Sequence, residues 1–333
     1  MDSMTARSKG GAIARMRHVV RDMVVVSLVT IVLTLGYIGS STQGDKVAKQ
    51  GYFGSAWYRD ALFNESTASD SQNIWFLETF GGRKLTPRAA CSIESACRHN
   101  DDYTVHLLST GNISSLSCPY HRVLSTIPNF RSALLNASTE LAGTPLSRLH
   151  AKGGNPHRSL YFAVRLSDFL RYAVIWKYGG IYLDTDVIVL RPLNGIRNSI
   201  VYEVDGGRMS NGVLFFTKNH PVLGAIMDLC SRRNTCGPQL LSALGYDEVL
   251  SRRVNFLSSQ TFLRFPFSQW RDLFDPKKTE EVLKAVNGSH GVHFWNTLNL
   301  RTVVMTRSGC AMDVLARAHC PLVYRLASSE GYL

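Results

Sequence analysis

The sequence predicts an α/β fold behind an N-terminal transmembrane helix, and three observations support this. Short β-prone runs alternate with helical stretches along most of the chain, as in a parallel sheet with helices on its faces. A charge-free apolar segment, residues 23–39, follows a basic N-terminus. An apolar run ends in two carboxylates, Asp184 and Asp186, where a strand would leave such a sheet.

The first element is the apolar segment 23–39, which we expect to be a signal-anchor behind a cytosolic tail, residues 1–22. As a helix it would span roughly 25 Å, somewhat less than the ~30 Å hydrocarbon core of a bilayer. A thin bilayer, or the neutral flank after the segment, closes this difference. Basic residues on its N-terminal side place the body of the chain in the lumen. The alternative is a cleaved signal peptide, but no A-x-A-like cleavage site follows, which favours a retained anchor.

Composition and sequence motifs agree with a lumenal body. The chain has 333 residues and a net charge of +12, without a basic block interleaved with aromatics, so nucleic acid is not an expected partner. The basic surface suits anionic small substrates or a membrane surface. Four N-x-[ST] sequons occur, at Asn64, Asn112, Asn136 and Asn287.

Seven cysteines follow the anchor: Cys91, Cys97, Cys118, Cys230, Cys236, Cys310 and Cys320. In an oxidising compartment they would form up to three disulfides and leave one free thiol. Cys230 with Cys236, and Cys310 with Cys320, are the candidate local pairs, although spacing alone does not fix the connectivity. No C-x-x-C spacing occurs, so a zinc ribbon is not expected.

After the anchor, residues 40–72 are polar and Gly-rich and are expected to form a stem. Residues 73–333 would form one lumenal catalytic domain. Its expected strands are 74–77, 103–108, 181–183, 199–204 and 211–217, and its expected helices are 87–98, 222–230 and 238–244. A further helix before Gly179-Gly180 carries Asp168 and Arg171, which are three residues apart and therefore share a face. The alternative for this pair is a surface ion pair worth ~0.5 kcal/mol.

The two carboxylates after the 181–183 strand are expected to point the same way because strand side chains alternate. A D-x-D pair alone is weak evidence for any function, because such a pair is ordinarily part of a solvated turn. The surrounding string "SDFLRYAVIWKYGGIYLDTD" is far more specific, and it resembles the signature of glycosyltransferases with the D-x-D sugar-binding region. With "NGVLFFTKNHP", "GPQLLSAL" and "VHFWN" downstream, the chain resembles the α1,4-glycosyltransferase family of lactosylceramide 4-α-galactosyltransferase and α1,4-N-acetylglucosaminyltransferase.

This resemblance implies a GT-A (Rossmann-like, nucleotide-sugar-binding) fold, a UDP-sugar donor, Mn²⁺ or another divalent cation, and retention of anomeric configuration. It implies a catalytic set of Asp168, Arg171, Asp184 and Asp186. Asp168 and Arg171 would bind the donor sugar, Arg171 also facing the phosphates, and Tyr182 and Asp184 would lie beside the ribose or the sugar. Asn211 would bond the transferred sugar, or would be an ordinary turn residue at the start of a strand.

The resemblance also implies a metal site made by Asp184, Asp186 and His293, with Asp186 as the most direct ligand. The alternative for His293 is a core histidine. The strand end from Phe76 to Glu78 would approach the uridine. Trp295 would stack on the uracil or the acceptor ring, or would be a buried core tryptophan.

The sequence and the resemblance together predict a type II Golgi membrane enzyme that transfers galactose or N-acetylgalactosamine from UDP-Gal or UDP-GalNAc, in α1,4 linkage, to a glycolipid. The alternative within this chemistry is UDP-GlcNAc as donor and a glycoprotein glycan as acceptor. An alternative in another class is a non-catalytic lumenal carbohydrate-binding protein. A haloacid-dehalogenase phosphatase and an EF-hand-like loop are disfavoured, because the further residues that each site needs cannot be placed. No carboxylate nucleophile can be assigned, which favours front-face transfer without a covalent intermediate.

Overall fold

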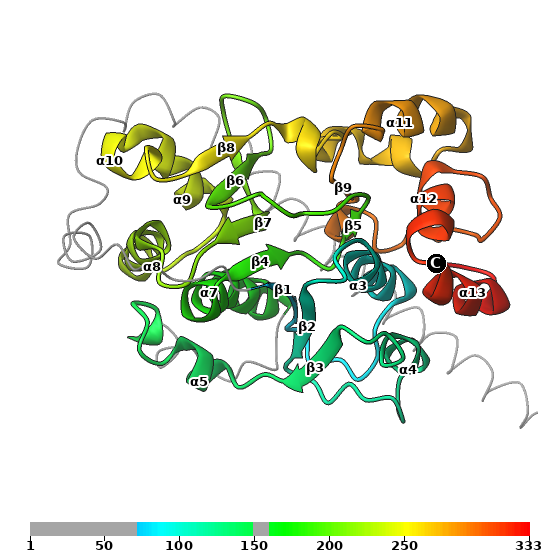
Figure 1. Ribbon diagram of the computed structural model, residues 1–333, viewed down its shortest axis with the longest axis horizontal. Helices are drawn as coiled ribbons and strands as arrows, with labels where there is room; N and C mark the ends of the chain where they lie inside the picture. Colours follow the sequence, from blue (N-terminus) through cyan, green and yellow to red (C-terminus); the bar gives the residue numbers. More distant parts are fainter. Residues whose placement is uncertain (1–71, 149–159) are drawn as a thin grey trace, which may run out of the picture. The chain divides into compact units, whose positions relative to one another are not determined.

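The computed structural model describes residues 72–148 and 160–333 (Figure 1). The predicted cytosolic tail (1–22) and anchor (23–39), and all of the stem (40–72) except Gln72, lie outside these residues. Among the described residues, none of the helices combines the length and apolar character needed to cross a membrane.

The main sheet has seven strands, in the order β3-β2-β1-β4-β7-β6-β8. The bounds are β1 Asn73–Glu78, β2 Thr104–Ser109, β3 Phe130–Leu134, β4 Gly180–Leu183, β6 Ser199–Tyr202, β7 Met209–Phe216 and β8 Asn255–Leu257. Within this sheet of the described chain, β7 runs antiparallel to both of its neighbours, β4 and β6, and the other pairings are parallel. The predicted α/β fold with a mostly parallel sheet is therefore confirmed.

A second sheet pairs β5 (Val187–Val189) with β9 (Gly291–His293) in antiparallel fashion. The α-helices are α3 Pro87–His99, α4 Pro119–Leu124, α5 Ala137–Leu141, α7 Leu160–Tyr178, α8 Pro221–Arg233, α9 Pro238–Ser242, α10 Glu248–Ser251, α11 Thr279–Val286, α12 Ala311–His319 and α13 Pro321–Glu330. Short 3₁₀ helices lie at Ala243–Tyr246, Ser259–Thr261, Phe267–Phe274, Pro276–Lys278 and Asn296–Leu298.

The main sheet separates two hydrophobic cores, because successive side chains of a strand point to opposite faces. In β1, Ile74 and Phe76 pack with α3, α4, α12 and α13, whereas Trp75 and Leu77 pack with α7 and α8. Residues 74–77 are all buried, which explains why this strand has a continuous apolar run rather than alternation. Helices on both faces leave the strand ends as the natural place for a ligand.

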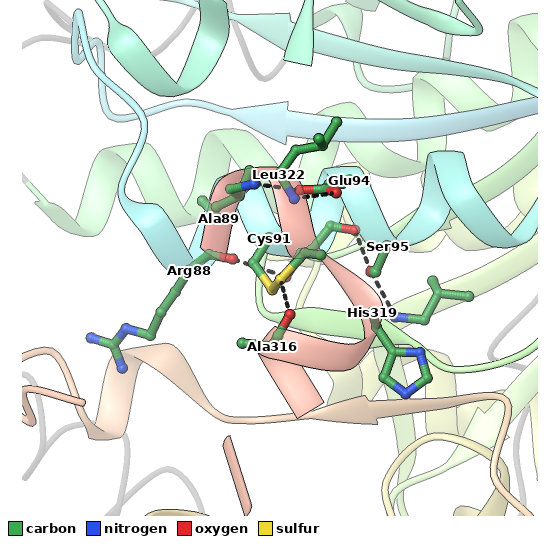
Figure 2. Close-up of a disulfide and its surroundings, with 12 residues drawn as sticks. Arg88, Ala89, Cys91, Glu94, Ser95, Ala316, His319 and Leu322 are labelled. Carbon is green, nitrogen blue, oxygen red and sulfur yellow. Dashed lines mark hydrogen bonds between the residues drawn. A yellow bond between two sulfur atoms is a disulfide. The ribbon is translucent and has the colours of Figure 1, made fainter. Parts of the chain in front are cut away.

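The C-terminal helices are fixed to α3. A disulfide joins Cys91 of α3 to Cys320, the residue before α13, as Figure 2 shows. Close to it, the buried carboxylate of Glu94 accepts the backbone N–H groups of Leu322 (2.9 Å) and Val323 (2.7 Å). A carboxylate in this place satisfies two of the free N–H groups at a helix N-terminus and is favoured by the helix dipole.

The predicted Cys310–Cys320 disulfide is wrong. Cys310 and Cys320 flank the two ends of α12, and a helix of nine residues is roughly 13 Å long. The Cα atoms of disulfide-bonded cysteines lie only about 4.4–6.8 Å apart, so these two cysteines cannot pair. The predicted Cys230–Cys236 pair is confirmed and closes the loop after α8. Two disulfides form, within the expected maximum of three. Three cysteines rather than one are free, and these are Cys97, Cys118 and Cys310, all buried.

Candidate active site

The two carboxylates of the D-x-D pair lie in the turn that carries the chain from the main sheet to the second sheet. β4 ends at Leu183 and β5 begins at Val187, and the turn is closed by the N–H of Val187 donating to the carbonyl of Asp184 (3.1 Å). Strand alternation, the reason given for their shared direction, is therefore wrong. The two side chains nevertheless converge, because the turn and the strand that pairs with β5 bring them to the same place.

That pairing supplies His293. It is the last residue of β9 and lies opposite Val187 of β5. Its Nε2 is 3.2 Å from Oδ1 of Asp186 and 3.8 Å from Oδ2 of Asp184. One ligand atom from each of the three side chains lies within 4.8 Å of the others. The structure thus brings together the three residues predicted to hold a metal.

In each carboxylate, one oxygen is held by the protein and the other faces this cluster. Oδ1 of Asp184 accepts the hydroxyl of Tyr182 (2.6 Å), which leaves Oδ2 toward His293. Oδ2 of Asp186 accepts the backbone N–H of Asn296 (2.7 Å), which leaves Oδ1 toward His293. Fixed outer-shell contacts of this kind orient the ligands of a metal.

Arg171 is buried and has a protein partner on each guanidinium nitrogen. Its Nη1 lies 2.9 Å from the carbonyl of Asn211 and 3.2 Å from Oδ1 of Asp184. Its Nη2 lies 3.2 Å from Oδ1 of Asp168 and 3.1 Å from the hydroxyl of Ser167, and its Nε donates to the carbonyl of Ser167. This is not the weak surface ion pair of the alternative interpretation. Arg171 links the D-x-D turn to α7 and β7, while its predicted contact with the sugar or the phosphates stays a prediction.

Asp168 and Asn211 lie beside the cluster and are linked to Asp184 through Arg171. The side-chain amide of Asn211 donates to Oδ1 of Asp168 (2.9 Å), from the neighbouring strand β7. Burial raises the pKa of Asp168 to about 6, even though the charge of Arg171 opposes this shift. A carboxylate and an amide at this position are polar groups that can bond the hydroxyls of a sugar.

The electrostatics of the cluster favour an ion pair inside it. Burial alone would raise the pKa of Asp186, but the charge and hydrogen bond of His293 and the N–H of Asn296 together lower it. Burial alone would lower the pKa of His293, but Asp186 and Asp184 raise it to about 10. Two clustered carboxylates need a nearby positive charge, and in the protein alone Arg171 beside Asp184 and the imidazolium of His293 beside Asp186 supply it.

The donor set fits a divalent hard cation. Two carboxylate oxygens and one imidazole nitrogen are ligands that Mn²⁺ accepts. Adjacent ligands around an ion with bonds of about 2.1 Å lie roughly 3 Å apart, close to the 3.2 Å between His293 and Asp186. The Nδ1 of His293 is buried without a partner among the described residues, so Nε2, which faces both acids, is the atom offered to a metal.

The other residues predicted to bind the donor lie around the cluster in different settings. Tyr182 is buried beneath Arg171, and its hydroxyl is used by Asp184. Trp295 is partly buried, and its ring packs edge-on against that of His293, with 4.4 Å between the ring centroids. Its Nε1 donates to the backbone carbonyl of Phe265. Stacking of Trp295 on a base or an acceptor stays a prediction.

At the end of β1, Phe76 is fully buried in the hydrophobic core, so its ring is not available to a nucleotide. Glu78 is the last residue of that strand, and one of its carboxylate oxygens accepts the backbone N–H of Phe80 (2.9 Å). Burial raises the pKa of Glu78. A uridine contact at this strand end would therefore come from Glu78 or from backbone rather than from the ring of Phe76.

Sequence reasoning missed Gly212. It lies in β7 beside the D-x-D turn, and its carbonyl accepts the N–H of Asp184 (2.8 Å). A Cβ at this position would lie only 2.7 Å from Oδ2 of Asp184, the oxygen that faces the cluster. A glycine inside a strand often marks such a close approach, which is the signal that could have identified it.

The Gly212→Ala variant is expected to lose at least about tenfold in kcat/KM with little change in melting temperature. The added methyl must displace the Asp184 carboxylate, which can rotate at small cost to folding but would then no longer face the cluster. Steady-state kinetics and thermal unfolding test this. Gly288→Ala is the matched control, because no atom lies within 4 Å of a Cβ built there. Unchanged kinetics of Gly212→Ala would contradict the expectation.

Two family models match the chain. Residues 86–203 match "Glycosyltransferase sugar-binding region containing DXD motif", which covers the site from α3 to β6. Residues 216–327 match "Alpha 1,4-glycosyltransferase conserved region", which covers β9 and His293. The mostly parallel sheet with the D-x-D turn at a strand end agrees with the GT-A fold expected from these families.

The chain is similar to curated proteins over most of its length. It is 30% identical over 274 residues to lactosylceramide 4-alpha-galactosyltransferase of Rattus norvegicus, which covers 76% of this chain and 75% of the relative. It is 29% identical over 289 residues to human alpha-1,4-N-acetylglucosaminyltransferase, with 78% and 82% covered. Among solved structures, a galactosyltransferase crystallised with donor and acceptor sugar analogues is 14% identical, with 75% and 95% covered and a TM-score of 0.42.

Proposed function

Since this chain belongs to the α1,4-glycosyltransferase family and is a hexosyltransferase, we propose that it transfers galactose or N-acetylgalactosamine from a UDP-sugar, in α1,4 linkage, to a glycolipid. The observation that carries the proposal is the cluster of Asp184, Asp186 and His293, at the end of β4 and beside Asp168 and Asn211. Such a place at the edge of an α/β sheet combines a cation site with groups that can bind a sugar.

The cluster is suited to the diphosphate of the donor, which the two carboxylates would repel without a cation between them. A divalent ion bound to Asp184, Asp186 and Nε2 of His293 would supply Lewis-acid stabilisation of the charge that develops on the departing UDP. The protein's part is to present the three ligand atoms together and to hold them in place. Tyr182 and the N–H of Asn296 do this by fixing the second oxygen of each carboxylate.

Asp168 and Asn211 would orient the donor sugar. Oδ1 of Asp168 is used by Asn211 and Arg171, so its second oxygen is the one to accept a sugar hydroxyl. Holding the sugar in one orientation beside the departing group lowers the entropic part of the barrier. The acceptor hydroxyl then forms its bond to the anomeric carbon on the face from which UDP leaves, and its proton passes to the departing phosphate.

The same proposal includes the Golgi membrane as the place of action, with the catalytic domain in the lumen. The apolar segment 23–39 with its basic N-terminal flank supports this orientation, and the sequons and disulfides suit an oxidising lumen. An anchored enzyme and an acceptor with a lipid tail would meet in the same membrane plane.

The experiment is a donor and acceptor screen with the full chain in detergent. UDP-Gal, UDP-GalNAc and UDP-GlcNAc are each offered with β-linked disaccharides that are free, lipid-linked or part of a glycoprotein glycan. Each reaction is run in Mn²⁺ or in EDTA, and the linkage of the product is determined. We expect α1,4 transfer from UDP-Gal or UDP-GalNAc, lost in EDTA. Transfer from UDP-GlcNAc alone, to a glycoprotein glycan, would establish the alternative. A covalent glycosyl-enzyme trapped in a single turnover would overturn front-face transfer.

A further inference from the structure

A short turn behind the cluster supports Asp186 from two directions. In this 294–299 turn, from Phe294 to Asn299, the N–H of Phe294 donates to the backbone carbonyl of Asp186 (3.0 Å). Two residues later, the N–H of Asn296 donates to the Oδ2 of the same residue (2.7 Å). The position and the orientation of the Asp186 carboxylate thus depend on the shape of this turn.

The turn contains an unfavourable backbone conformation. Trp295, between the two donors, has a φ of 56°, in the left-handed region that a bulky residue rarely occupies. Such a conformation is unfavourable and persists only where surrounding contacts impose it. Some part of the protein must therefore hold the turn closed.

Asn299 and Arg88 provide these contacts. Asn299 is 1% exposed, and its side-chain amide donates to the carbonyls of both Phe294 and Trp295. Its Oδ1 accepts the Nη1 of Arg88, and its backbone carbonyl lies 3.5 Å from the Nη2 of Arg88. Because two guanidinium nitrogens of Arg88 contact Asn299, they fix this asparagine more firmly than a single donor would.

Arg88 itself is held in a rigid place. It is 8% exposed and lies in the first turn of α3, whose Cys91 is joined to Cys320. Figure 2 shows its side chain extending away from this disulfide. Burial lowers the pKa of Arg88 and the charge of Asp186 opposes this, so the cation and the carboxylate are near enough to interact electrostatically.

We propose that Arg88 is a positioning residue for the metal site, which acts on Asp186 through Asn299 and the 294–299 turn. The inference rests on the proposed function, because it concerns the same cation site. It assigns a role in cation binding to a residue of α3 that lies outside the D-x-D turn and outside the three ligands.

The test is a titration of Mn²⁺ into the full chain without any sugar nucleotide, with free Mn²⁺ measured by electron paramagnetic resonance. Arg88→Met is expected to weaken Mn²⁺ binding by about 10–100-fold, the range typical of lost outer-shell partners. Arg88→Lys, which can offer only one nitrogen to Asn299, should recover part of this loss. Arg98→Met is the matched control, because Arg98 lies on the same helix but is exposed.

A second variant tests the route and remains informative if Arg88→Met does not fold. Asn299→Asp keeps an acceptor for Arg88 but removes both amide donations to the turn, and it should weaken Mn²⁺ binding to a similar extent. In the double variant the two losses should not add, because both act on the same turn. Wild-type affinity in Arg88→Met or Asn299→Asp, or full additivity, would overturn the inference alone. No Mn²⁺ binding by the wild-type chain would overturn the proposed cation site as well.

Discussion

Replacing Asp186 by asparagine is expected to slow glycosyl transfer by at least about a thousandfold while the protein stays folded. Stabilisation of the departing charge by a metal is worth several kcal/mol, and about 4 kcal/mol corresponds to a thousandfold in rate. The asparagine oxygen can still accept the N–H of Asn296, so the turn keeps its support. Asp184→Asn should have the same effect, since it removes the second carboxylate of the cluster.

The measurements are initial rates of UDP release at saturating Mn²⁺ and donor, together with thermal unfolding. Asp101→Asn is the matched control, because Asp101 is exposed and precedes β2, whereas the site follows β4, a strand that runs in the same direction. Turnover like that of the wild type in both site variants would remove the metal cluster from the mechanism. A large fall in melting temperature would instead mean that the carboxylates are structural.

Replacing Arg171 by methionine is expected to destabilise the protein by roughly 3–5 kcal/mol near pH 7, because it leaves two partly buried carboxylates, Asp168 and Asp184, without their partner. Arg232→Met is the control. Arg232 also pairs with an aspartate on its own helix, Asp228, but at a more exposed position where such a pair contributes at most about 1 kcal/mol.

The effect of Arg171→Met should also depend on pH, with a sign that follows from Asp168. The pKa of Asp168 in the folded protein, about 6, lies above its ordinary value of 3.8, so between these values the folded state binds more protons than the unfolded state. The contribution of Asp168 to stability is therefore highest below about pH 4 and falls until about pH 6. Without Arg171 the pKa of Asp168 rises further, so the stability of the variant continues to fall to higher pH.

The stability difference between wild type and Arg171→Met should therefore widen from pH 6 to about pH 8. Urea unfolding at a series of pH values measures this difference directly, since titrating groups that Arg171 does not contact contribute equally to both proteins. A difference that does not change with pH would contradict the assignment of the effect to Asp168.

Local sequence signals predicted β1, β2, β4, β6 and β7 of the main sheet and helices α3, α7, α8 and α9. The strands at 73–78 and 104–109 and the helix at 87–99 follow from apolar runs bounded by Gly and Pro. The reversed direction of β7 could not be predicted, because strand direction depends on pairing across the sheet rather than on residue pattern. The Cys91–Cys320 disulfide joins residues 229 apart and has no local signal either.

The resemblance predicts that Asp184, Asp186 and His293 hold a metal, and the structure places these three side chains together. The residues that support them could not be predicted from the sequence. The N–H of Asn296 acts through the backbone, so its side chain carried no signal. Arg88 meets Asn299 across 211 residues, a contact that only the folded chain reveals.

The pairing of β5 with β9 brings together two parts of the proposed cation site that are far apart in sequence, Asp186 and His293. His293 reaches Asp186 through three paired residues on each strand, while the residues from Leu190 to His290 form other elements. The loops of that stretch can change in length without moving the histidine, provided that β5 and β9 still pair and that β7 and the carbonyl of Phe262, which accepts the N–H of His293 (2.9 Å), keep their places. Different acceptor specificities could therefore evolve in these loops around one unchanged cluster of Asp184, Asp186 and His293.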